Sequence, residues 1–316
     1  MTYSDTNADP SSVTAVLVGR KGNVFKPAVS GGYLDLSEIP EEAKYDDLYT
    51  LTIKGTDLAG NDQTASVEFI LNRYGSNVDV TGTNYQGRYL QAPVDVDLEE
   101  VTVEALREDK TDIKVTLDGA PYSIAPALQS TTRTGGDTGD YVYAYHIDKA
   151  AFQKEGTYLI QVVSQTEGGL DQVSHLGYSF VVDSTNPEIQ VSGIRTDAAY
   201  RSESRDFTVT PRDMTTVTLE AQVDGKTMQL LSDENGVYTG TLPQSTSAHT
   251  VVLKATDMAG NVTETTISDV YVNASTFGQV INWIRHHVLA TSAAGGILAA
   301  AAALIVWARR RKNADN

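Results

Sequence analysis

The sequence predicts an all-β chain of tandem antiparallel β-sandwiches, followed by a single C-terminal transmembrane α-helix. Three observations predict this fold class. Apolar and polar residues alternate with a period of two through much of residues 1–272, which is the pattern of half-buried strands. A strand–turn–strand unit recurs along that region. Finally, residues 288–308 carry no charged side chain and are followed directly by four basic residues.

The recurring unit first spans residues 49–71. Tyr49, Leu51 and Ile53 alternate with polar residues, and a second alternating run follows the turn. The unit returns at residues 249–272, and a diverged copy lies at residues 158–182. Three copies of one unit predict three modules, each large enough for an antiparallel sandwich.

The turns of the first and third units share the pattern T-D-x-A-G-N. An Asp at the start of a turn accepts backbone N–H bonds, Gly supplies a positive φ, and Asn tolerates the left-handed region. We therefore predict structural turn residues, which are Asp57, Gly60, Asn61, Asp257, Gly260 and Asn261. The middle copy, residues 166–170, keeps a Gly but lacks the Asp and the Asn, so its turn geometry stays open.

These motifs carry a resemblance to a known family. The T-D-x-A-G-N turn, the segment Glu155-Gly156-Thr157-Tyr158 and the junction Phe180-Val181-Val182-Asp183-Ser184-Thr185-Asn186-Pro187 resemble the immunoglobulin-like repeats of large Gram-positive bacterial surface proteins. The resemblance covers roughly residues 1–272 and implies an immunoglobulin-like sandwich for each module. Such repeats occur in adhesins, spacers and enzyme appendages, so the resemblance favours no single function.

Boundaries follow from the repeats and from Pro187, which forces the residue before it into an extended conformation and cannot donate to a strand ladder. A polar run near residues 130–140 predicts an exposed, mobile hairpin loop. The first module is short for a sandwich, so we expect it to be incomplete at its N-terminal side. The predicted segments are sandwiches at residues 1–75, 76–185 and 186–272, a juxtamembrane amphipathic helix at 273–287, a transmembrane helix at 288–308 and a basic cytoplasmic tail at 309–316.

The predicted anchor has a defined orientation. About 21 residues at 1.5 Å each give roughly 31 Å of helix, close to the thickness of the hydrocarbon core of a bilayer. Trp283 and Trp307 bracket the segment at the depths that aromatic belts occupy. The basic residues Arg309, Arg310, Arg311 and Lys312 mark the C-terminal end as cytoplasmic.

The anchor predicts a single-pass cell-membrane protein with residues 1–272 outside the cell. The alternative is a buried, Ala-rich helix of a soluble domain, which the adjacent arginines disfavour. The first residues lack the basic and apolar regions of a signal peptide. Because an outward-facing protein with a C-terminal anchor needs one, we expect further chain upstream.

Composition excludes several classes of function. The formal net charge is −17, so nucleic-acid binding through a basic groove is not expected. The chain has no cysteine, which excludes disulfide frameworks, thiolate metal sites and thiol catalysis. That absence also fits a bacterial protein better than a eukaryotic secreted one.

No catalytic, cofactor-binding or metal-binding residue is predicted. The five histidines include no H-E-x-x-H pair, and no phosphate-binding loop is present. His249 takes the place of Tyr49 in the repeat and is expected to pack in the core. Acidic residues gather at Asp95, Asp97, Glu99 and Glu100, and at Asp183 with Asn186. We interpret them as solvated surface and expect Ca²⁺ to leave the melting temperature unchanged.

The sequence therefore predicts a non-catalytic, membrane-anchored bacterial cell-surface protein that acts as an adhesin or as a spacer stalk. The alternative is the stalk and anchor of a large exported enzyme, such as a glycan-degrading enzyme, whose catalytic domain lies upstream. The predicted partner is the lipid bilayer, and a glycan or protein ligand stays open. Small residues at every fourth position of the membrane segment permit helix pairing, but this spacing is common by chance in an Ala-rich helix, so a homodimer is not expected.

Overall fold

The computed structural model describes residues 6–275 except residues 31–32, 136–138 and 174–176. The chain divides into two compact units, Met1–Val182 and Asp183–Asn316. Within the described ranges, no helix is long and apolar enough to cross a membrane. The predicted transmembrane helix at residues 288–308 lies outside the described residues.

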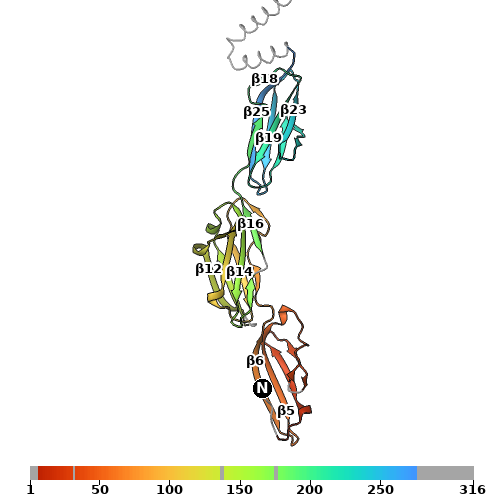
Figure 1. The fold of residues 1–316 in the computed structure, drawn as a ribbon, viewed down its shortest axis with the longest axis vertical. Helices are drawn as coiled ribbons and strands as arrows, with labels where there is room; N and C mark the ends of the chain where they lie inside the picture. The colour runs from red at the N-terminus through yellow and green to blue at the C-terminus, as the bar shows by residue number, and fades with distance from the viewer. Residues whose placement is uncertain (1–5, 31–32, 136–138, 174–176, 276–316) are drawn as a thin grey trace, which may run out of the picture. The chain divides into compact units, whose positions relative to one another are not determined.

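The first module is a four-stranded antiparallel sheet with the order β2-β1-β5-β6 and a separate β3–β4 ribbon. Figure 1 labels the two long strands, β5 and β6, which pair along their whole length. Leu17 and Tyr49 are fully buried at the centre of its core. The elements are η1 (Pro10–Ser12), β1 (Thr14–Gly19), β2 (Val24–Phe25), β3 (Val29–Ser30), β4 (Tyr33–Leu34), η2 (Ala43–Tyr45), β5 (Asp47–Thr56) and β6 (Asp62–Leu71).

The second module is a sandwich of two sheets. One has the order β11-β10-β14-β16-β8, with β15 beside β14, and the other has the order β12-β13-β9-β7. The short strand β8 pairs with β16 in parallel, whereas the other pairs are antiparallel. The elements are β7 (Asn77–Val80), β8 (Tyr89–Leu90), β9 (Val96–Thr102), η3 (Glu108–Lys110), β10 (Asp112–Leu117), β11 (Ala120–Tyr122), η4 (Ala125–Ala127), β12 (Leu128–Gly135), β13 (Asp140–Ile147), η6 (Lys149–Phe152), β14 (Gly156–Gln165), β15 (Asp171–Val173) and β16 (Tyr178–Val182).

The third module has the same strand order, except that the single strand β25 (Val262–Val272) takes the place of β15 and β16. Its sheets have the orders β18-β25-β24-β20-β21 and β17-β19-β23-β22, and the short strand β18 again pairs in parallel with the last strand. The predicted all-β fold is therefore confirmed for the described residues, and the second and third modules are the predicted sandwiches. The elements are β17 (Glu188–Ser192), β18 (Ala198–Tyr200), β19 (Ser204–Arg212), β20 (Thr218–Val223), β21 (Lys226–Met228), β22 (Leu231–Ser232), β23 (Tyr238–Pro243), β24 (His249–Thr256) and β25 (Val262–Val272).

The predicted mobile loop near residues 130–140 is wrong for residues 130–135. These residues belong to β12, which pairs with β13 in unbroken register from Leu128 opposite Ile147 to Gly135 opposite Asp140. The run lacks apolar residues but contains several threonines, and a β-branched side chain favours an extended strand even where it faces water. A lack of apolar residues is therefore a poor sign of a loop at the edge of a sheet.

In each of the three modules, a side chain near the start of an equivalent strand (β5, β14 or β24) hydrogen-bonds to a backbone carbonyl oxygen that precedes the strand. Tyr49 Oη donates to the carbonyl oxygen of Tyr45 at 2.8 Å, and Tyr158 Oη donates to that of Lys154 at 2.8 Å. This contact is the tyrosine corner of immunoglobulin-like sandwiches. Burial raises the pKa of both phenols, so the hydroxyls remain donors into alkaline solution as well as at neutral pH.

His249 takes the place of the corner tyrosine in the third module. It is 5% exposed, and its Nε2 lies 2.9 Å from the carbonyl oxygen of Pro243. Its Nδ1 lies 2.8 Å from Asp224 Oδ2. The predicted packing role of His249 is confirmed, and the imidazole also replaces the tyrosine hydroxyl as a partner of the backbone.

Candidate functional site

The turn between β5 and β6 is organised by Asp57. Its Oδ1 accepts from the N–H groups of Ala59 at 2.9 Å and Asn61 at 2.7 Å. Gly60 has a φ of +89°, which is the left-handed conformation that favours glycine. Asn61 does not adopt a positive φ, so the left-handed role suggested for it is wrong. Its side-chain Nδ2 instead donates to Asp57 Oδ2 at 2.7 Å.

The turn between β24 and β25 repeats this arrangement in a buried setting. Asp257 Oδ1 accepts from the N–H groups of Gly260 at 2.7 Å and Asn261 at 2.8 Å, and Gly260 has a φ of +92°. Asn261 Nδ2 donates both to Asp257 Oδ2 and to the carbonyl oxygen of Asp183, at 2.8 Å each. Asp257 and Asn261 are each 7% exposed.

The diverged middle turn keeps the same backbone geometry. Thr166 N donates to the carbonyl oxygen of Leu170 at 3.0 Å, and Gly169, with a φ of +93°, donates to that of Thr166 at 3.0 Å. Thr166 Oγ1 accepts from Leu170 N at 3.2 Å, where the other turns use the Asp carboxylate. The turn therefore depends on its glycine and on one side-chain acceptor, and Thr can supply that acceptor.

Replacing Gly60 or Gly260 by valine is expected to destabilise only the sandwich that contains it, by about 1–3 kcal/mol. A β-branched side chain is strained at these positive φ values. At Gly60 an added Cβ meets nothing within 4 Å, so backbone strain alone sets the cost there. Hydrogen exchange resolved by peptide would measure the stability of each sandwich. Leu58→Val, at a side chain 76% exposed in the same turn, is the control, and unchanged exchange in both Gly variants would contradict the turn assignment.

Three carboxylates meet in the third sandwich at the turn of Asp257. One oxygen from each of Asp183, Asp213 and Asp257 lies within 4.8 Å of the others. Asp183 precedes β17, Asp213 directly follows β19, and Asp257 follows β24. Asp183 is fully buried. The group could hold a metal ion, since it offers several hard oxygen ligands at one point.

Asp183 has an unusual environment for a carboxylate. Its Oδ2 accepts from Thr215 Oγ1 at 3.0 Å, whereas its buried Oδ1 has no hydrogen-bond partner. Burial, together with the nearby carboxylates of Asp213 and Asp257, raises the pKa of Asp183. The sequence grouped Asp183 only with Asn186 and did not indicate that Asp213 and Asp257 lie beside it. The Asp of the turn motif was visible in the sequence, but the packing of three loops at one corner was not.

The acidic residues of β9 do not form one solvated face. Asp97 and Glu99 are only partly buried, whereas Glu100 is fully buried on the side of Leu98 and Thr102. Hydroxyl groups from Ser76, Ser164 and Tyr145 donate to the Glu100 carboxylate. The interpretation of Glu100 as solvated surface is therefore wrong, because residues 98, 100 and 102 share the inner face of the strand.

A second acidic group surrounds His146 on the surface of the second sandwich. His146 offers a nitrogen close to carboxylate oxygens of Asp95 and Asp148. Its Nδ1 lies 2.7 Å from Asp97 Oδ1, and this hydrogen bond raises the pKa of His146. Because Asp95 Oδ1 already accepts from Lys149 N at 2.8 Å and the group is open to water, it forms a solvated acidic surface.

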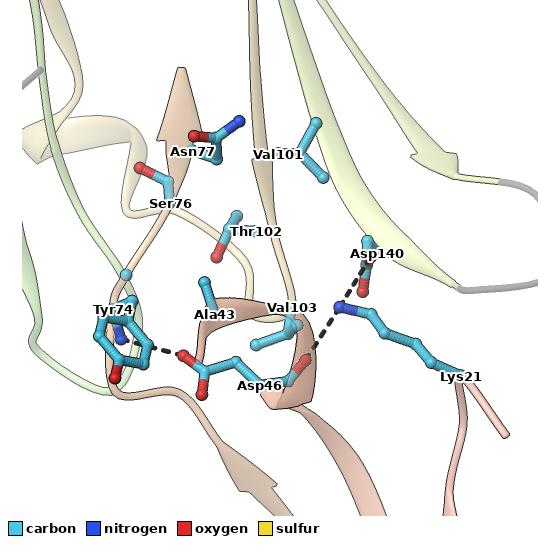
Figure 2. Close-up of a pocket in the computed structure, with 11 residues that line it drawn as sticks. Lys21, Ala43, Asp46, Tyr74, Ser76, Asn77, Val101, Thr102, Val103 and Asp140 are labelled. Atoms are coloured by element: carbon cyan, nitrogen blue, oxygen red, sulfur yellow. Dashed lines mark hydrogen bonds and ion pairs between the residues drawn. The ribbon is translucent and has the colours of Figure 1, made fainter. Parts of the chain in front are cut away.

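A cavity of about 450 Å³ is lined by residues of the first and second modules. Figure 2 shows Lys21 reaching towards Asp46 and Asp140 at its edge. Lys21 Nζ lies 3.1 Å from Asp140 Oδ2 and donates to the carbonyl oxygen of Asp46 at 2.9 Å. The Asp46 carboxylate accepts from the N–H groups of Arg73 and Tyr74. Because these groups are already joined by an ion pair and by hydrogen bonds, we assign the cavity to a structural contact within residues 1–182.

One protein-family model matches part of the chain. Residues 154–273 match the model of the bacterial Ig-like domain family. The match covers the last part of the second sandwich and the whole of the third. No curated protein matches the sequence significantly.

Several solved structures are similar to the chain at low identity. The fibronectin(III)-like modules of Clostridium thermocellum CbhA are 16% identical, with 62% of this chain and 94% of that chain covered and a TM-score of 0.29. An I-band fragment of titin is 9% identical, with 83% and 88% covered and a TM-score of 0.36. A tetra-tandem repeat from the extending region of a large adhesion protein is 17% identical, with 83% and 67% covered and a TM-score of 0.30.

The predicted anchor residues lie outside the described residues, so the structure places none of them. They are Trp283, Trp307, Arg309, Arg310, Arg311 and Lys312. The start of the predicted juxtamembrane helix is described only to residue 275. There Asn273 Oδ1 accepts from Ser275 N at 2.9 Å, and Asn273 Nδ2 donates to the carbonyl oxygen of Ser245 at 3.0 Å.

Proposed function

We propose that this chain is a non-catalytic, membrane-anchored surface protein of a bacterium, whose Ig-like sandwiches act as a spacer stalk or adhesin outside the cell. The observation that carries the proposal is the combination of tandem sandwiches with the uncharged segment 288–308 and its basic end. The match of residues 154–273 to a bacterial Ig-like domain supports the repeat part. The bilayer is the proposed partner, with a glycan or protein as a further ligand.

A structural role agrees with how the polar groups of the sandwiches are used. Among the described residues, two histidines pair with carboxylates: His146 contacts Asp97, and His249 contacts Asp224. Neither imidazole ring forms a hydrogen bond with a serine hydroxyl within the described ranges. Each contact ties neighbouring strands or turns together. Polar side chains with such fixed partners stabilise the modules, as a stalk requires.

Protease added to intact cells is expected to remove epitopes placed in residues 1–272 and to spare a tag at Asn316. The reason is that the four basic residues after the membrane segment hold the C-terminus in the cytoplasm. Immunoblotting for both tags measures the result, and lysed cells, in which protease reaches both, are the control. Protection of the ectodomain epitopes in intact cells would contradict the proposed topology.

A further inference from the structure

We propose that Asp183, Asp213 and Asp257 form a Ca²⁺-binding site in the third sandwich. Each residue presents a carboxylate oxygen within 4.8 Å of the other two. Ca²⁺ takes oxygen ligands at 2.3–2.6 Å, so two of its ligands are up to about 5 Å apart. The three oxygens can therefore bind one ion with little movement of the backbone.

The charge of this group is not balanced by basic side chains. None of the ion pairs among the described residues includes Asp183, Asp213 or Asp257. Like charges at this distance repel strongly where burial reduces screening by water. A divalent cation would turn that repulsion into attraction.

The unpartnered oxygen of Asp183 points independently to a missing ligand. Asp183 is 0% exposed, and its Oδ1 makes no hydrogen bond. A buried carboxylate oxygen without a partner is costly, and nearly all such groups in proteins are satisfied. Its other oxygen is held by Thr215, so the side chain is fixed with one oxygen available to an ion.

The rest of the corner is already organised for binding. Asp257 accepts three hydrogen bonds from its own turn, which fixes the carboxylate and leaves it a further lone-pair direction. Asn261 Nδ2 links this turn to the backbone of Asp183. Two of the three proposed ligands are thus positioned by one Asn before any ion binds, while water can complete a coordination shell of six to eight.

The matching corner of the second sandwich provides an internal comparison. There the turn has Thr166 in place of Asp257, and the loop after β9 supplies Glu104. Asn72, which follows β6 as Asp183 follows β16, donates through Nδ2 to Glu104 Oε2 at 3.3 Å. One carboxylate with an amide partner needs no cation, so only the third sandwich is expected to respond to Ca²⁺.

The full chain, purified in detergent and treated with chelator, would be titrated with CaCl₂ by isothermal calorimetry. Its melting would then be followed with and without 5 mM CaCl₂. We expect about one ion to bind per chain. The melting temperature of the unfolding transition of the third sandwich should rise by at least about 5 °C. Hydrogen exchange of peptides containing residues 257–261 should slow roughly tenfold, while peptides containing residues 166–170 should not change.

Asp183→Asn and Asp213→Asn separate an ion site from a merely structural role. Each variant keeps the shape of the side chain but removes a ligand charge. We expect both to lose the response to Ca²⁺ and, in chelator, to fold at least as stably as the parent because repulsion is relieved. Failure of Ca²⁺ to bind or to shift melting, as expected from sequence alone, would overturn the proposal. An unaltered response in both variants, or an equal response to MgCl₂, would also overturn it.

Discussion

Replacing Glu100 by alanine is expected to destabilise the second sandwich by about 3–5 kcal/mol. The Glu100 carboxylate is fully buried and accepts from Ser76 Oγ, Ser164 Oγ and Tyr145 Oη. Alanine leaves all three hydroxyls, which are themselves at most 7% exposed, without that acceptor, and it also creates a cavity. Removing the buried carboxyl group returns some desolvation energy, but the loss of three hydrogen bonds outweighs it.

Two variants control this experiment. Glu100→Gln keeps one acceptor oxygen and the volume of the side chain, so a smaller loss of about 1–2 kcal/mol is expected. Glu99→Ala removes the neighbouring surface acid, whose Oε2 lies 2.9 Å from Arg133 Nη2, and should cost under about 1 kcal/mol. Hydrogen exchange of peptides from β9 and β13 would measure the three variants. Equal losses for Glu99→Ala and Glu100→Ala would show that the buried network contributes little.

The contrast between Glu99 and Glu100 shows what the sequence could predict. Alternation over residues 96–102 was enough to predict a strand and, taken strictly, to place residue 100 on its inner face. Glu100 was interpreted as a surface residue because it is acidic, although its position in the alternation indicates the inner face. The partners of Glu100 could not be predicted, because Ser76 and Ser164 come from segments 24 and 64 residues away.

The same limit applies to the candidate cation site. The turn pattern around Asp257 predicted a hydrogen-bonded turn, and local geometry alone decides such a feature. That Asp183 and Asp213 meet this turn depends on how loops from three strands pack, which no local pattern reports. Conversely, the sequence left the geometry of the middle turn open, and the structure shows the same backbone turn, because its glycine and the strand pairing around it still determine the backbone.

The aromatic cluster of the second sandwich is a further feature that the alternation of apolar and polar residues does not predict, because Phe152 lies outside the strands. Phe152 lies in η6, a short 3₁₀ turn whose Asp148 Oδ1 accepts from Ala150 N at 2.7 Å. Its ring is fully buried and makes edge contacts with Tyr158 and Phe180, at centroid distances of 5.0 Å and 5.1 Å. The cap therefore positions an aromatic ring against side chains of the paired strands β14 and β16.

Phe152→Ala is expected to destabilise the second sandwich by about 3–5 kcal/mol, because it leaves a cavity and removes two edge contacts between rings. Phe152→Leu fills part of that space and should cost about half as much. Gln153→Ala, at the exposed next residue, should change stability by under about 0.5 kcal/mol. Hydrogen exchange in β14, compared with β24 of the third sandwich, would measure all three. A loss spread equally over both sandwiches, or equal losses for alanine and leucine, would contradict a local cavity as the cause.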